Sequence, residues 1–143
     1  MVYVKKVLIF CICIIVATSC GYAETIYGDA GSIAPYYVTT RSTSEVFIIN
    51  STGNASMTAT LKPLNNNMID QVKMTLCIKK IGGNVVYNKT FNGIWSNLFS
   101  EYNLTKTYQL PSRGTYTFNV IYKCYRNNTL VETITTDYVM DSY

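Results

Sequence analysis

The chain has 143 residues and a net charge of +4, a length that provides for one domain and not for two. Hydrophobic residues make up 48% of it and charged residues 14%, a balance that excludes an intrinsically disordered protein. Histidine is absent, which excludes Ser-His-Asp and Cys-His catalysis and histidine-based zinc sites.

Residues 1–23 follow the order of a secretory signal peptide. Lys5 and Lys6 precede an uninterrupted apolar run over residues 7–16, and small side chains surround a cleavage position after Ala23. The run is shorter than the roughly 20 residues of a membrane-spanning helix. We therefore expect cleavage and secretion, with retention of the segment as a membrane anchor as one alternative. In a second alternative, residues 17–20 resemble a bacterial lipobox, and acylation of Cys20 would anchor the protein at the cell surface.

The charge of the secreted part indicates which partners to exclude. Loss of Lys5 and Lys6 with the signal peptide lowers the net charge from +4 to +2. A nucleic-acid-binding protein needs a clustered basic face, and Lys79-Lys80 is the only basic pair left. We expect no nucleic-acid partner, and no membrane partner unless Cys20 is lipidated.

Residues 24–43 have no regular period and predict an irregular leader, whereas residues 44–143 predict a single β-domain. Short runs of strand-forming residues alternate there with turn residues, and no apolar period of 3.6 residues indicates a helix. Gly82-Gly83 and Asn127-Asn128 predict tight turns, and residues 94–100 predict a loop around Trp95. About seven strands are expected, over residues 46–49, 55–61, 71–81, 85–91, 102–110, 114–125 and 130–139.

Seven short antiparallel strands predict two packed sheets, and one motif resembles the immunoglobulin family. Gly114-x-Tyr116-x-Phe118 is similar to the tyrosine corner at the start of the penultimate strand of that sandwich. The resemblance implies an immunoglobulin-like β-sandwich in which the Tyr116 hydroxyl returns to the backbone. Phe118 stands where antibody domains keep a cysteine. The layout, including the hairpin signal over residues 79–83, also resembles small exported proteins of unknown function from low-GC Gram-positive bacteria.

Two of the five cysteines remain in the predicted domain, Cys77 and Cys124, and two cysteines in an exported domain allow one disulfide. The alternating pattern predicts that the Cys77 side chain points away from the core and that the Cys124 side chain points into it. A bond would therefore need a bulge that changes the phase of one strand. Both the bridged and the free state stay open at this point.

The residues that support catalysis are sparse, so we expect no enzyme, no cofactor and no metal site. The eight Asp and Glu residues are scattered at strand ends and turns. A glycosidase would need two facing carboxylates. A hydrolase that uses carboxylates is the least favoured alternative.

Aromatic residues give the clearest candidates for ligand contact. Tyr and Trp combine a flat apolar ring with one polar group, an O–H or N–H, and this combination suits contacts with sugars and protein surfaces. We select Trp95, Tyr102, Tyr36 and Tyr37, with core packing as the alternative role of Trp95. The expected function is non-enzymatic binding of a protein or glycan at a cell surface, and the alternative is a structural coat or matrix component.

Five Asn-x-Ser/Thr sequons are glycan acceptors if the source is eukaryotic or viral. They begin at Asn50, Asn54, Asn88, Asn103 and Asn127.

Overall fold

The computed structural model describes residues 38–143, and this part of the chain is all-β. The predicted signal peptide, Cys20, Tyr36 and Tyr37 lie outside the described residues. Nine strands form two antiparallel sheets, with no helix among the described residues. The strands are β1 (Thr40–Ile49), β2 (Asn54–Pro63), β3 (Gln71–Lys80), β4 (Val85–Asn92), β5 (Ile94–Ser96), β6 (Glu101–Gln109), β7 (Thr115–Arg126), β8 (Thr129–Thr135) and β9 (Val139–Ser142).

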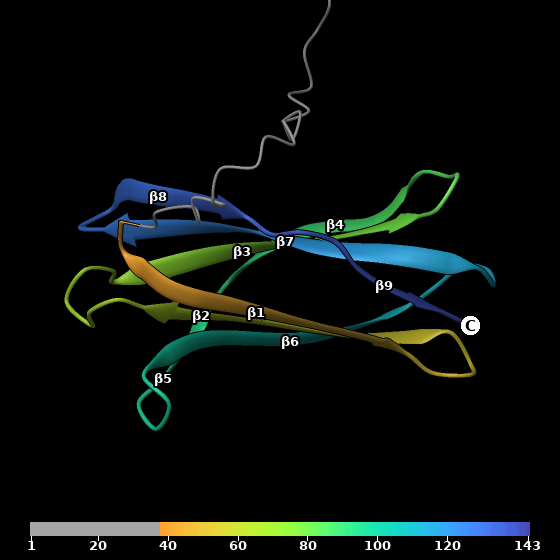
Figure 1. Cartoon of the computed structure of the whole chain (residues 1–143), viewed down its shortest axis with the longest axis horizontal. Coiled ribbons are helices and arrows are strands. Elements are labelled where there is room, and N and C mark those ends of the chain that lie inside the picture. Colours follow the sequence, from red (N-terminus) through yellow and green to blue (C-terminus); the bar gives the residue numbers. More distant parts are fainter. Residues whose placement is uncertain (1–37) are drawn as a thin grey trace, which may run out of the picture. The chain divides into compact units, whose positions relative to one another are not determined.

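The two sheets lie face to face (Figure 1). One sheet has the order β1-β2-β6-β5, and the other has the order β4-β3-β7-β8. Strand β9 also pairs with β7, alongside residues 115–118, whereas β8 pairs with residues 121–126. The predicted all-β class with two packed antiparallel sheets is confirmed.

Strict alternation of side chains builds the core between the sheets. In β2 the fully buried side chains are those of Ala55, Met57, Ala59 and Leu61, and the residues between them are only half-buried. In β3 the buried set is Val72, Met74, Leu76 and Ile78. Because successive side chains of a strand point to opposite faces, each sheet presents one apolar face to the other.

The number and limits of the strands correct the sequence prediction in three places. Strand β1 begins at Thr40, so the β-domain includes residues assigned to the irregular leader. The predicted loop of Trp95 contains a short strand, β5, which pairs with β6. The predicted closing strand is divided into β8 and β9. At the end of β8, the Thr136 N–H donates to the Val120 carbonyl and the Thr136 hydroxyl accepts the Val120 N–H, both at 3.0 Å.

The start of β1 is held by one carboxylate of β8. Glu132 accepts hydrogen bonds from the Val38 N–H at 2.8 Å and from the hydroxyls of Thr39 and Thr40 at 2.5 and 2.9 Å. Thr39 and Thr40 are buried as a result. Apolar periodicity carries no signal of such a contact, which explains why the predicted domain began too late.

The expected tyrosine contact is present at the start of β7. The Tyr116 hydroxyl donates a hydrogen bond to the Ser112 carbonyl at 2.5 Å, and the ring is fully buried. Gly114 precedes it with φ of 148°, a backbone conformation that glycine adopts readily. The sequence pattern therefore predicted this contact correctly.

Cys77 and Cys124 are both free thiols, so the structure does not contain the disulfide considered from the sequence. Cys77 lies opposite Asn119 and Cys124 lies opposite Val72 in the β3–β7 register. Five positions therefore separate the two on neighbouring strands, and their side chains point to opposite faces. The predicted facings are confirmed, since Cys124 is fully buried and Cys77 is only half-buried.

Candidate functional site

A cleft of about 680 Å³ opens at the end of the sandwich where the chain crosses from one sheet to the other. Two crossings line it, from β2 to β3 and from β4 to β5. The second crossing passes through Gly93, whose N–H donates to the Val72 carbonyl at 2.8 Å. A Cβ at this position would lie 2.9 Å from Met74 Cε and 3.3 Å from Tyr102 Cβ. Asn92 and Gly93 therefore form part of one wall of the cleft.

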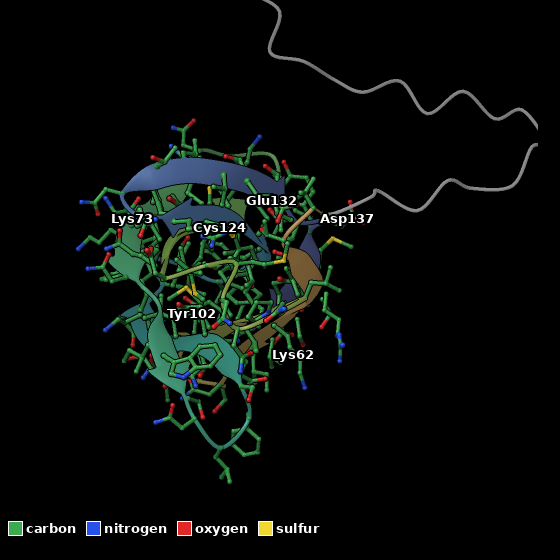
Figure 2. The ribbon with its side chains drawn as sticks, turned by 90° about the vertical axis from the view of Figure 1, so that its left-hand side faces the viewer. Lys62, Lys73, Tyr102, Cys124, Glu132 and Asp137 are labelled. Carbon is green, nitrogen blue, oxygen red and sulfur yellow. The ribbon has the colours of Figure 1, made fainter. Side chains whose placement is uncertain are left out.

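Trp95 and Tyr102 form the aromatic wall of the cleft. They are direct partners in the β5–β6 register, and their ring centroids lie 5.0 Å apart with the planes at 60°. The Trp95 indole N–H donates to Asn97 Oδ1 at 2.8 Å. Figure 2 shows Tyr102 inside the sandwich, and its exposed fraction is 7%. The structure therefore brings together two of the four aromatic residues selected from the sequence.

Trp95 is half-buried, and it packs against the core while it lines the cleft. The core role and the contact role considered for it are therefore compatible. Its indole edge is held by Asn97 and its ring by Tyr102, so the side chain has little freedom to lose when a ligand binds.

The Tyr102 hydroxyl anchors the connection between β2 and β3. It donates to the Ile69 carbonyl at 3.3 Å. Burial, followed by the nearby Asp70 carboxylate, raises the pKa of Tyr102, so the hydroxyl remains a protonated donor at neutral pH.

The remaining wall is polar and rich in amides. The amide and hydroxyl side chains that line it belong to Asn66, Gln71, Asn92, Asn97 and Ser100. Asp70 is the one carboxylate among the lining residues, and its Oδ2 accepts the Asn127 N–H at 2.6 Å. Asn127 and Asn128 have φ of 48° and 62°, which confirms the predicted tight turn. Sequence reasoning missed these polar residues, because single amides at strand ends and turns are common in any β-protein.

A smaller hollow of about 320 Å³ lies beside β1 and contains the carboxylates of Glu45 and Asp137. Glu45 accepts a hydrogen bond from the buried Tyr122 hydroxyl at 2.7 Å. This bond joins β7 to β1 and gives Glu45 a role between the two sheets. Over residues 38–143, no three Cys, Asp or Glu side chains gather closely enough to hold a metal ion.

The sequon asparagines lie mostly at the surface. Asn50, Asn54, Asn88 and Asn127 are exposed, and Asn103 is half-buried. Asn50 Oδ1 accepts the N–H groups of Thr52 and Asn54 at 3.0 and 2.9 Å, so this side chain caps its own turn.

No protein-family model and no curated protein matches the chain. Within the described residues, no helix is long and apolar enough to cross a membrane. The chemical character of the cleft is therefore the basis for a functional proposal. An aromatic wall faces several amides, one hydroxyl and the Asp70 carboxylate, and this set of groups provides stacking and hydrogen bonds.

Proposed function

We propose that the protein is a secreted, non-enzymatic immunoglobulin-like module that binds a glycan in the cleft beside Trp95. The observation that carries the proposal is the aromatic pair of Trp95 and Tyr102 set against amide side chains. Sugars present apolar C–H faces and rings of hydroxyl groups, which aromatic faces and amides complement. The predicted signal peptide supports the secreted location.

The immunoglobulin-like assignment is supported by strand order. The orders β1-β2-β6-β5 and β4-β3-β7-β8 correspond to the ABED and CFG sheets of that family, with β4 as an added strand beside C. The Tyr116 hydrogen bond at the start of β7 lies where the family places its tyrosine corner. In this correspondence the cleft lies at one end of the sandwich, where immunoglobulin domains carry binding loops.

A glycan array followed by titration calorimetry with wild type and Trp95→Ala tests the proposal. We expect Trp95→Ala to weaken binding at least about tenfold, which corresponds to about 1.4 kcal/mol. Because Trp95 also contacts the core, a second variant is Asn92→Ala, which removes an exposed amide from the cleft wall. Asn84→Ala is the matched control, since Asn84 is exposed in the turn at the far end of the same hairpin.

The result that would contradict the proposal is equally specific. If no glycan binds the folded protein, or if both cleft variants bind as wild type does, the cleft is not a glycan site. Turnover of a polysaccharide by the wild type would overturn the non-enzymatic assignment.

A further inference from the structure

Three lysines lie on the outer face of the sheet that contains β3 and β7. In β3 the buried residues point inward, so Lys73 and Lys79 point outward. Lys123 of β7 is the direct register partner of Lys73, and directly paired residues share a face. We refer to these three side chains as the lysine stripe.

The lysine stripe has no acidic counterpart on its face. The described residues contain six Asp and Glu: Glu45, Asp70, Glu101, Glu132, Asp137 and Asp141. None of these occupies an outward register position of β3, β4 or β7, and Glu132 and Asp141 pair with the inward-facing Cys124 and Tyr116. Like charges directly opposite each other in a sheet are unfavourable, so the face retains an uncompensated positive charge that an anionic ligand would neutralise.

The stripe is continuous with the cleft. Lys73 is the register partner of Asn92, and Gln71 precedes it on the same face of β3. Both Asn92 and Gln71 line the cleft. Figure 2 shows Lys73 and Lys62 on different sides of the molecule, and Lys62 belongs to β2 of the opposite sheet. From Lys73 to Lys79 the strand extends about 20 Å, at roughly 3.3 Å per residue.

The surface between the lysines suits a hydrated chain of sugars. Thr75 and Thr90 are register partners there, with hydroxyls 2.7 Å apart, and Asn88 lies opposite Cys77. The Lys73 ammonium also lies 5.1 Å from the centre of the Tyr125 ring on the same face. Lysine acts as a mobile point charge rather than as a bidentate fork, which suits carboxylate or sulfate groups distributed along a polymer.

From this arrangement we infer that the ligand is a linear acidic polysaccharide, bound in the cleft at one sugar and running along β3 over the lysine stripe. The inference rests on the proposed glycan site and specifies its ligand class. Trp95 and the amides contact the sugar ring, and Lys73, Lys123 and Lys79 contact its anionic groups.

Two polymer pairs that differ only in charge test the inference. The probes are polygalacturonate with its methyl ester, and dextran sulfate with dextran, titrated at several salt concentrations. We expect the acidic member of at least one pair to bind about tenfold or more tightly than its neutral member at low salt. This advantage should shrink as salt rises, because counterion release drives such binding.

The double variant Lys73→Gln/Lys123→Gln should remove the preference for the acidic polymer and leave neutral binding unchanged. Lys62→Gln, on the opposite sheet, is the matched control and should retain the preference. Equal affinity for acidic and neutral members in both pairs, absence of binding to all four polymers, or an equal loss in Lys62→Gln would each overturn the inference. Polyphosphate binding as tight as that of dextran sulfate and unaffected by Trp95→Ala would also overturn it.

The variants distinguish a wrong ligand class from a wrong glycan site. If Trp95→Ala and Asn92→Ala weaken both members of a pair while the lysine variant changes nothing, the glycan site stands and the acidic ligand class is wrong. If the cleft variants leave every affinity unchanged, the proposed glycan site itself is wrong.

Discussion

Tyr116 illustrates how a single polar atom determines a local conformation in this protein. Its ring is fully buried, while its hydroxyl satisfies the Ser112 carbonyl four residues upstream. The ammonium of Lys80 reinforces the same turn, with hydrogen bonds of 2.8 Å to the Ser112 hydroxyl and to the Arg113 carbonyl. The turn from β6 to β7, residues 111–114, therefore combines these side-chain contacts with backbone hydrogen bonds between Gly114 and Tyr143.

Tyr116→Phe should lower the free energy of unfolding by about 1 to 3 kcal/mol, since it leaves a partly buried carbonyl without its donor. Urea denaturation measured by fluorescence checks this value. Tyr138→Phe is the control, because Tyr138 is 67% exposed, and we expect it to change stability by less than about 0.5 kcal/mol. Equal stability of Tyr116→Phe and wild type would show that the bond contributes nothing.

At the scale of elements, the β1–β2 hairpin shows how the C-terminus constrains a turn. Gly53 has φ of 80°, and its carbonyl accepts the Leu110 N–H at 2.9 Å. An added Cβ would lie 2.4 Å from the Tyr143 ring, so the last residue of the chain packs directly on this turn. The Tyr143 ring in turn stacks near Tyr116, with centroids 6.4 Å apart. Residues distant in sequence thus meet at one end of the sandwich.

Gly53→Ala should destabilise the fold by about 1 kcal/mol or more, because alanine would have to adopt the left-handed φ of 80° and the Tyr143 ring would have to move aside. Gly83→Ala provides the matched control in the β3–β4 hairpin. Gly83 has no positive φ, and a Cβ there would meet Lys80 Cβ at an ordinary 3.4 Å. Thermal unfolding of the two variants measures this difference, and we expect a lower melting temperature for Gly53→Ala than for Gly83→Ala. A similar melting temperature for both would contradict the prediction.

Across the whole molecule, buried ionisable groups join the two sheets. The Tyr122 hydroxyl of β7 reaches Glu45 of β1 and the Thr60 carbonyl of β2, at 2.7 and 3.1 Å. Burial, together with the Glu45 carboxylate, raises the pKa of Tyr122 well above its usual range. Burial also raises the pKa of Cys124 to about 11. Both groups are therefore neutral in the folded protein at physiological pH.

These shifts predict that stability falls under alkaline conditions. Above pH 9 the thiol of the unfolded chain loses its proton while folded Cys124 keeps it up to about pH 11. The unfolded state then binds fewer protons, so the free energy of unfolding decreases as pH rises through this window. The same holds for Tyr122 and Tyr102. A tyrosine of the unfolded chain loses its proton near pH 10, whereas the pKa of both residues is raised in the folded protein, so their contribution also lowers the free energy of unfolding as pH rises.

Urea denaturation at intervals from pH 7 to pH 10.5 measures this dependence. Cys124→Ala should be less stable at pH 7, because it leaves a cavity, but its stability should fall less steeply between pH 9 and pH 10.5. The same slope in the variant and in wild type would rule out a contribution from this thiol.

Much of the sandwich was predictable from the sequence, because alternation in β2, β3 and β7 is a local pattern that reflects one buried face. The turn at Asn127-Asn128 and the Tyr116 contact were likewise predictable, since both depend on residues within a few positions of one another. Strand β5 was not predictable, because three residues are too short for a periodic signal and β5 exists only by pairing with β6.

The sequence alone determined the predicted export signal, the absence of histidine chemistry and the facing of the two domain cysteines, because these follow from composition and local period. Only the tertiary structure decided that the cysteines stay apart, because register between β3 and β7 is set by the packing of whole strands. It also decided that Trp95 meets Tyr102 and the amides of the cleft. Residues 66 and 102 line one cleft although 36 positions separate them, and only the folded sheets bring such residues together.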